Sequence, residues 1–351
     1  MYNRSERVSI QNNSPVRSVS GADGLRHICF MNRLLRRFCP EGLRWLAAAA
    51  VVFVWGFCGF SVHASEAPLE TLMEDGYLNH INRIAIDLPN VSGEYRYAVV
   101  NDSHMICLNE EVKEEDLELL GERRESFRSP GGYYSEETFR AVMGAVDRLD
   151  LDGVILNGDI VDEASAGNYS LAYNTLKKLD TPYMYLRADH DSEAYWTEPH
   201  EDRMSRIAGK LGLSAGVKVW ETQDFTLVGL NDTTTAVTQQ QLTAAGSHLK
   251  GKKPVILFSH VPYAPKADPD FSAFVKGVRG RLIFWGGDNS LYEQNAVMES
   301  WMDMVYRKDN PVKAVICGHI HGEYRGPLNG SITQYVCGPC FGGTLTILSV
   351  F

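Results

Sequence analysis

Apolar segments that run directly into Asp or His constrain the fold of this chain more than any other feature. The clearest is Val154–Asp162, where a β-prone run leads into Gly158-Asp159 and a second carboxylate, Asp162, follows three residues later. This pattern predicts a buried strand that ends in a tight turn, because Gly158 can turn without a Cβ clash. Open α/β sheets bind ligands at the carboxyl ends of their strands. Asp159 is therefore expected to lie in a ligand site.

Four other apolar segments have the same form. Eight histidines follow Ala64, and five of them fall at these predicted strand ends. One such histidine would usually be a surface or core residue, but five at matching positions are difficult to explain by chance. Imidazole together with carboxylate suits Mn, Fe, Zn or Ni, whereas an all-oxygen set would suit Mg or Ca. The potential ligands at the four ends are Asp102 with His104, Asp189 with His190 and Asp191, His260, and His319 with His321.

The order of strands and helices predicts an α/β sandwich. Between residues 95 and 187, strand-like and helix-like segments alternate as βαβαβ, which implies a mostly parallel core sheet with right-handed crossovers. Residues 217–221 and 225–230 read as a hairpin, and Asn329-Gly330 is the strongest hairpin signal of the chain. We expect two packed mixed sheets flanked by helices. The expected divisions are an N-terminal extension (1–64), a connector with one short helix (65–94) and a single domain (95–351).

The N-terminal extension has the features of an export signal. Four arginines between residues 33 and 44 precede the uncharged, apolar residues 46–62, and small or β-branched residues at 62 and 64 suit cleavage after Ala64. The apolar run is also close to the shortest length that spans a membrane. A cleaved signal and a retained N-terminal anchor therefore both remain open. Either one predicts a periplasmic or extracellular body.

Charge separates the extension from the body. Residues 1–45 carry eight Arg against three acidic residues, whereas the whole chain has a net charge of −10, so the body carries −15. Generic nucleic-acid binding is unexpected for such a body, because it depends on basic surfaces that neutralise backbone phosphates.

Cys337-Gly338-Pro339-Cys340 has the spacing of a redox motif. It falls between two predicted strands, however, and not at the start of a helix after a strand, which argues against redox function. A structural disulfide, which an exported protein can form, and two free thiols both remain open.

The ordered set of strand-end motifs resembles the calcineurin-like metallophosphoesterase family over roughly residues 95–325. The motifs are Asp102-x-His104, Gly158-Asp159-x-x-Asp162, Asp189-His190-Asp191, His260 and Gly318-His319-x-His321. The resemblance implies two packed sheets with a two-metal centre at the strand ends. It implies that Asp102, His104 and His321 hold one metal, that Asp189, His260 and His319 hold the other, and that Asp159 bridges both.

The same resemblance implies hydrolysis of phosphate esters. Two ions roughly 3.5–4 Å apart clamp the attacking and leaving oxygens of a phosphoryl transfer. We expect in-line attack by a hydroxide that bridges the metals, with His190 protonating the leaving oxygen. The resemblance implies that Asp162 orients His190 and keeps it protonated, although Asp162 could instead be a cap or turn residue. Asp191 is either a support for the site or a turn residue.

Two departures from the family pattern bear on activity. Asp189 stands where the family usually has Asn, which adds a negative charge and removes an amide donor for phosphate. Glu163 stands where the protein-phosphatase branch has Arg, which argues against a phosphoprotein phosphatase. We expect an exported hydrolase of phosphate mono- or diesters, acting on a small or nucleotide-like ester. The alternatives are a catalytically weakened metal-binding scaffold and a nuclease of the same fold; the sequence does not indicate an oligomeric state.

Overall fold

The computed structural model describes residues 66–351 except 110–111, 198–200, 214–215, 234–235, 267, 288–289 and 293. The chain divides into residues 1–63 and 64–351, and the fold below belongs to the second unit. The predicted signal or anchor, including residues 46–62, lies outside the described residues. Within the described part, no helix combines the length and apolar character needed to cross a membrane.

The first sheet has five strands in the order β1-β11-β2-β3-β4. The strands β2, β3 and β4 are parallel, as the βαβαβ pattern predicted, and β11 runs antiparallel to β2. The bounds are β1 (His80–Ile86), β2 (Tyr95–Val100), β3 (Gly153–Asn157), β4 (Tyr183–Leu186) and β11 (Thr344–Val350).

Strand β1 was missed in the predicted connector. Its centre carries Asn82 and Arg83, which interrupt the apolar pattern, and it pairs in parallel with β11 at the other end of the chain. A strand that depends on so distant a partner has a weak local signal. Residues 80–86 are therefore part of the first sheet and not only a connection.

The second sheet has six strands in the order β5-β6-β7-β8-β10-β9. Strands β5 and β6 form the predicted antiparallel hairpin, and β9 and β10 pair antiparallel around Asn329-Gly330 as predicted. Strands β6, β7 and β8 are parallel, so the sheet is mixed. The bounds are β5 (Val217–Glu221), β6 (Thr226–Leu230), β7 (Val255–Phe258), β8 (Val312–Cys317), β9 (Tyr324–Pro327) and β10 (Thr333–Val336).

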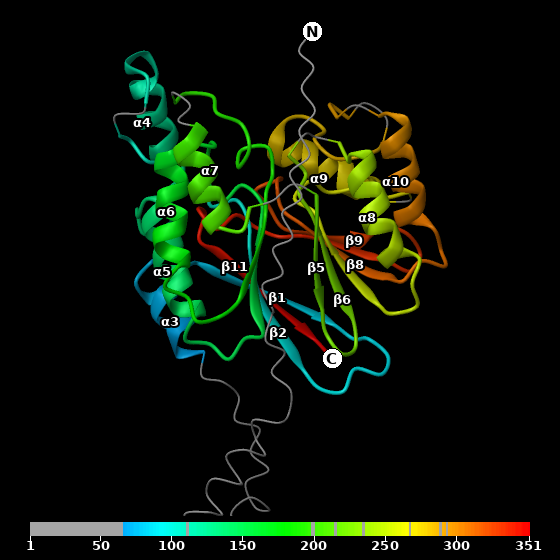
Figure 1. The fold of residues 1–351 in the computed structure, drawn as a ribbon. Helices are drawn as coiled ribbons and strands as arrows, with labels where there is room; N and C mark the ends of the chain where they lie inside the picture. The colour runs from blue at the N-terminus through cyan, green and yellow to red at the C-terminus, as the bar shows by residue number, and fades with distance from the viewer. Residues whose placement is uncertain are drawn as a thin grey trace, which may run out of the picture. The chain divides into compact units, whose positions relative to one another are not determined.

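Helices flank both sheets (Figure 1). On the first sheet lie α3 (Ala67–Glu74), α5 (Ser135–Val146), α6 (Ala166–Leu176) and α7 (Glu201–Lys210). On the second lie α8 (Gln239–Leu249), α9 (Pro269–Arg279) and α10 (Ala296–Tyr306). A short 3-10 helix, η2 (Glu114–Asp116), precedes α4 (Leu117–Ser126). Helix α9 was not predicted, although Asp268 caps it and Pro269 occupies its first position.

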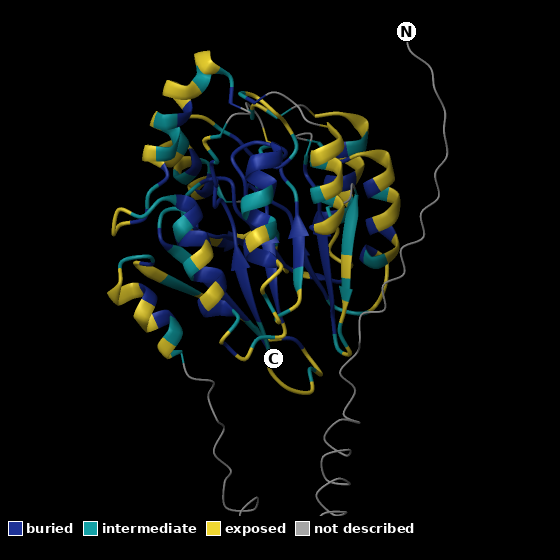
Figure 2. Ribbon diagram, turned by 60° about the vertical axis from the view of Figure 1, so that its left-hand side comes forward, coloured by how far each residue is buried: buried dark blue, intermediate teal, exposed yellow. Residues whose placement is uncertain are grey.

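The core lies between the sheets and beneath the helices. Tyr97, Ile155, Phe258 and Ile316 belong to the apolar layer that the two sheets share. Every residue of β3, β6 and β7 is buried, as expected for strands covered on both faces (Figure 2). The carboxyl ends of these buried strands are therefore held rigidly, and side chains that follow them have fixed positions.

The cysteine motif does not form a disulfide. Cys337 and Cys340 are buried free thiols. Of the two alternatives that the sequence left open, the structure supports free thiols.

Candidate metal centre

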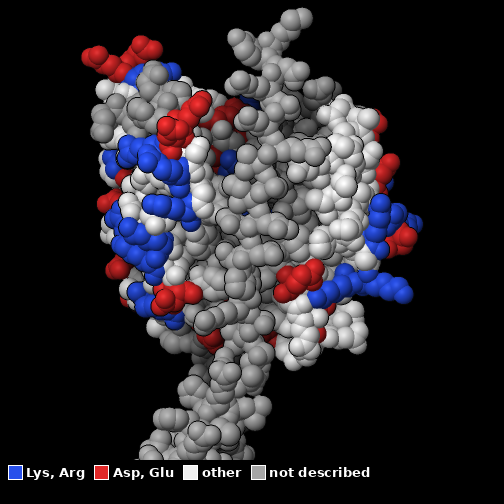
Figure 3. All heavy atoms as spheres, in the orientation of Figure 1, with Lys and Arg blue, Asp and Glu red and all other residues white. Residues whose placement is uncertain are grey.

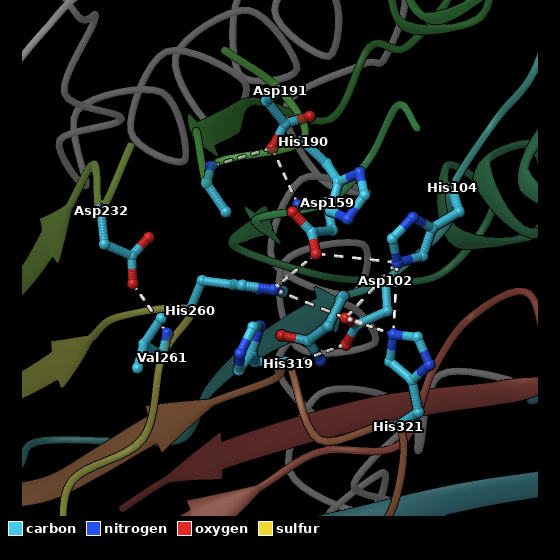
Figure 4. A network of polar contacts seen from close by, with 12 residues as sticks. Asp102, His104, Asp159, His190, Asp191, Asp232, His260, Val261, His319 and His321 are labelled. Atoms are coloured by element: carbon cyan, nitrogen blue, oxygen red, sulfur yellow. Dashed lines mark hydrogen bonds and ion pairs between the residues drawn. The ribbon is translucent and has the colours of Figure 1, made fainter. Parts of the chain in front are cut away.

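Six of the seven predicted metal ligands converge at the carboxyl ends of strands from both sheets. They form two groups whose ligand atoms lie within 4.8 Å of one another, Asp102/His104/His321 and Asp159/His260/His319. Figure 4 shows the four histidine rings around the carboxylates of Asp102 and Asp159. Residues more than 200 positions apart in the chain thus supply neighbouring ligand atoms.

The spacing of these atoms fits metal binding. The Nε2 atom of His104 lies 3.2 Å from Nε2 of His321 and 3.6 Å from Oδ2 of Asp159, which in turn lies 3.0 Å from Nε2 of His260. Ligand atoms about 2.1 Å from one ion are separated by roughly 3–3.5 Å in a tetrahedral site. Asp159 therefore lies between the two groups, where a bridging ligand would be needed.

Buried polar atoms without partners support the same interpretation. Oδ1 of Asp159 is buried and has no hydrogen-bond partner, and Oδ1 of Asp102 and Nε2 of His260 are buried and only have ion-pair contacts within the cluster, at 3.0–3.9 Å. Leaving such atoms unpaired is costly, so each is expected to have a partner in the functional state. The donor set, carboxylate with imidazole, suits the transition metals named above.

The backbone is strained at the ligands themselves. In the described part of the chain, six residues other than glycine have positive φ, and five of them are predicted ligands: Asp102 (48°), His104 (45°), Asp159 (52°), His319 (70°) and His321 (57°). Such conformations cost on the order of 1–3 kcal/mol each and are concentrated at functional sites. The left-handed conformation of these residues turns the chain sharply after β2, β3 and β8, so that the ligand side chains point toward the centre.

Glycines make the close approach of these turns possible. A Cβ atom on Gly158, which has φ +90°, would lie 2.5 Å from Nδ1 of His260. A Cβ on Gly318 would lie 2.8 Å from Oδ2 of Asp102. Both glycines of the sequence motifs are therefore required by the packing of the ligands.

Comparison with known proteins decides the family. The sequence profile described as calcineurin-like phosphoesterase matches residues 95–323. The chain belongs to the calcineurin-like phosphoesterase family. This confirms the resemblance and the two-sheet fold, and with the clustered ligands it supports a metal-dependent phosphoester hydrolase.

Several solved structures are similar to this chain. A dimetal phosphatase from Danio rerio is 14% identical, with a TM-score of 0.47 over 70% of this chain and 88% of its own. A purple acid phosphatase from yellow lupin (Lupinus luteus) is 12% identical, with a TM-score of 0.42 over 73% and 45%. A phosphopantetheinyl hydrolase from Mycobacterium tuberculosis is 10% identical, with a TM-score of 0.36 over 71% and 92%. The comparison with curated proteins found no match.

Asp189, the seventh predicted ligand, is in none of the three groups of potential ligands that the described residues form, the third of which is His104/Asp162/His190. Burial and the nearby Asp159 carboxylate raise the pKa of Asp189 above its ordinary value. Its backbone carbonyl accepts hydrogen bonds from the N–H groups of Ser192 (2.8 Å) and Glu193 (3.0 Å). Asp189 thus begins a turn beside the centre, and its role as a ligand stays a prediction.

Asp162 faces His190 with its backbone carbonyl more closely than with its carboxylate. Its Oδ1 atom lies 2.9 Å from Nδ1 of His104 and 3.7 Å from Nδ1 of His190. The backbone carbonyl of Asp162 accepts a hydrogen bond from Nδ1 of His190, at 2.7 Å. The buried side chain is turned toward His104 and toward the guanidinium of Arg123, which leaves the carbonyl to orient His190. Despite burial, His104 and Arg123 hold the pKa of Asp162 at about 2.

Asp191 supports the site and is more than a turn residue. Its fully buried carboxylate joins the turn after β3 to the end of β4, beside Asp159 (Figure 4). The donors are the backbone N–H groups of Asp159 (2.8 Å), Ile160 (3.0 Å), Val161 (3.1 Å) and Ala188 (3.0 Å), and the Tyr185 hydroxyl (2.8 Å). These bonds fix the strained backbone that aims Asp159.

Two side chains that the sequence did not single out contact the outer nitrogens of the terminal histidine motif. The Tyr292 hydroxyl lies 2.6 Å from Nε2 of His319, and Nη1 of Arg279 lies 2.9 Å from Nδ1 of His321. Burial and the neighbouring His260 lower the pKa of His319 to about 3, so its ring is neutral, as a metal ligand must be. No local sequence pattern marks Tyr292 or Arg279, because only the fold brings them to the site.

Glu163 has a structural role. Its buried carboxylate accepts the N–H groups of Tyr195 and Trp196, both at 2.9 Å. The residue that replaces the arginine of the protein-phosphatase branch thus fixes the loop after His190.

Asp232 is a further buried carboxyl at a strand end, after β6, and the pattern used for the other ligands could have found it. One oxygen accepts the Val261 N–H at 2.7 Å, whereas Oδ1 has no partner (Figure 4). Burial raises the pKa of Asp232 to about 7.

A pH-dependent stability follows for the metal-free protein. Between about pH 4 and pH 7 the folded state holds a proton on Asp232 that the unfolded chain has released, so stability falls as pH rises through this range. We expect Asp232→Asn to remove up to about 4 kcal/mol of this dependence. Urea unfolding of both proteins near pH 4.5 and pH 8 measures it. Equal losses of stability between pH 4.5 and pH 8 in the two proteins would show that Asp232 is not the source of the pH dependence.

Proposed function

We propose that this protein is an exported, dinuclear-metal hydrolase of small phosphate esters. The observation that carries the proposal is the pair of ligand groups, Asp102/His104/His321 and Asp159/His260/His319, with the Asp159 carboxylate between them. Two transition-metal ions held by these residues would supply a nucleophilic hydroxide near neutral pH and would neutralise charge on the phosphoryl group, so that no covalent intermediate on the protein would be needed.

His190 is positioned to act as the general acid. Its Nδ1 donates to the Asp162 carbonyl, which leaves Nε2 free to face the leaving oxygen, and its side chain is 24% exposed. Burial opposes protonation, but the carboxylates of Asp159, Asp162 and Asp189 together raise the pKa of His190. An imidazolium that can donate a proton near neutral pH is the expected form.

The His190 assignment predicts a dependence on the leaving group. We expect His190→Gln to lower kcat about 100-fold or more for an alkyl phosphate, and much less for p-nitrophenyl phosphate, whose leaving group needs little protonation. Steady-state rates on both esters measure the effect. His248→Gln, on the outer helix α8, is the matched control. Equal losses on both esters would show that His190 does not donate this proton.

Charge at the centre supports a small ester. Arg279, beside His321, has no carboxylate partner among the described residues. Its guanidinium can bind a phosphate oxygen, which the carboxylate of Glu163, at the position of the phosphatase-branch arginine, cannot do. On the face seen in Figure 3, basic side chains gather over the flank of α6 and α7, but acidic side chains lie among them. This surface offers no broad basic path for a polynucleotide, which makes the nuclease alternative weaker.

One assay tests the proposal and its alternatives. The full chain is supplied with Mn, Fe, Zn or Ni and tested on p-nitrophenyl phosphate, bis-p-nitrophenyl phosphate and single-stranded DNA, with a chelator control. Metal-dependent turnover of a small ester supports the proposal, and the preferred ester decides between monoester and diester. Metal binding without turnover would favour the scaffold, and turnover of DNA alone the nuclease. N-terminal sequencing of the exported protein distinguishes cleavage after Ala64 from a retained anchor.

A further inference from the structure

We propose that Arg123, on α4, is a positioning residue for the metal that Asp102, His104 and His321 would hold. The inference rests on the proposed metal centre. It gives a role in metal binding to Arg123, which lies outside the sequence motifs. Helix α4 belongs to the long segment between His104 and α5.

The contact between Arg123 and Asp162 is bidentate. Nε of Arg123 donates to Oδ2 of Asp162 at 2.9 Å, and Nη2 donates to Oδ1 at 2.7 Å. The Asp162 side chain is completely buried, whereas that of Arg123 is 28% exposed. A paired guanidinium and carboxylate of this geometry form strong, directional hydrogen bonds. Without Arg123, Asp162 would lack its only arginine or lysine partner among the described residues.

Asp162 transmits this contact to the metal ligand. The same Oδ1 atom lies 2.9 Å from Nδ1 of His104, whose opposite nitrogen, Nε2, faces Asp102, Asp159 and His321. An ionised Asp162 favours the tautomer of His104 that carries its proton on Nδ1 and its lone pair on Nε2. Such outer partners orient a histidine ligand and raise its basicity.

Aromatic side chains fix Arg123 in this place. Its guanidinium lies 4.6 Å from the centroid of the Trp196 ring and 5.4 Å from that of Phe127. Phe127 itself stacks on His104, with centroids 4.6 Å apart and planes inclined by 10°. The end of α4 is thus packed against both the ligand and the arginine that acts on it.

The neighbouring arginines have other partners. Arg124 pairs with Glu136, and Arg128 pairs with Glu125, outside the two ligand groups. Arg124 therefore offers a matched control, because it lies on the same helix and also forms an ion pair.

The test measures metal binding. We expect Arg123→Met to weaken binding of one of the two metals about 10- to 100-fold, with the other unchanged. Competition with a chelator gives the two affinities with Mn²⁺ as the probe, and electron paramagnetic resonance shows loss of the coupled two-metal signal. Arg123→Lys keeps the charge but not the bidentate contact, so its metal affinity should lie between those of the wild type and Arg123→Met. Arg124→Met should have the wild-type affinities. Unchanged affinities in a folded Arg123→Met protein would overturn the proposal.

A double-mutant cycle separates positioning from general stability. If Arg123 acts through Asp162, Arg123→Met should weaken metal binding little further in an Asp162→Asn background. A full additional loss in that background would show that Arg123 acts by another route. Wild-type protein that binds two metals but hydrolyses no ester would contradict the proposed function, while these affinities would still decide the role of Arg123.

Discussion

Asp159→Ala is expected to lower kcat on a phosphate ester at least about a thousandfold, because it removes several kcal/mol of transition-state stabilisation by metal. The Asp159 carboxylate lies 3.0 Å from Nε2 of His260 and 3.6 Å from Nε2 of His104, between the two ligand groups. Its removal should therefore lower occupancy at both sites. Steady-state kinetics and elemental analysis of the same preparation measure the two effects.

Two comparisons make this result specific. Asp159→Asn keeps the size of the side chain but removes its charge, so it should also lose most activity. Asp150→Asn, at an exposed position before β3, should retain wild-type turnover and metal content. Turnover of Asp159→Ala within tenfold of the wild type, with two metals still bound, would contradict the bridging role.

Asp191→Ala is expected to cause the largest loss of stability, roughly 3–5 kcal/mol in the free energy of unfolding. The change leaves four backbone N–H groups and the Tyr185 hydroxyl without their buried acceptor. It also releases the strained turn at Asp159, so activity should fall with stability. Urea unfolding monitored by circular dichroism measures the loss.

A conservative variant distinguishes the hydrogen-bond acceptor of the Asp191 side chain from its negative charge. Asp191→Asn keeps one acceptor oxygen and should lose less stability than Asp191→Ala. A loss below about 1 kcal/mol in Asp191→Ala, the range of a surface substitution, would show that the turn does not depend on this carboxylate.

Most of the site could be predicted because its signal is local. Each ligand motif follows an apolar strand, and a parallel arrangement brings the ends of such strands to one edge. That reasoning located Asp102, His104, Asp159, His260 and the Gly318–His321 motif, and it gave the two-sheet fold. It did not find β1, whose pairing partner β11 is far away in sequence, or α9.

The amino-acid sequence by itself determined the residue types at the ends of the ligand-bearing strands, the order of these motifs along the chain and hence the metal-dependent phosphoesterase family. Only the tertiary structure decided how the supporting residues are used: Asp162 turns its carboxylate to His104 and Arg123 and its carbonyl to His190. It also brought Arg279 and Tyr292 to the histidines. The physical reason is that a ligand's residue type and its place after a strand are local properties, whereas the direction of a hydrogen bond depends on partners that only packing brings within reach.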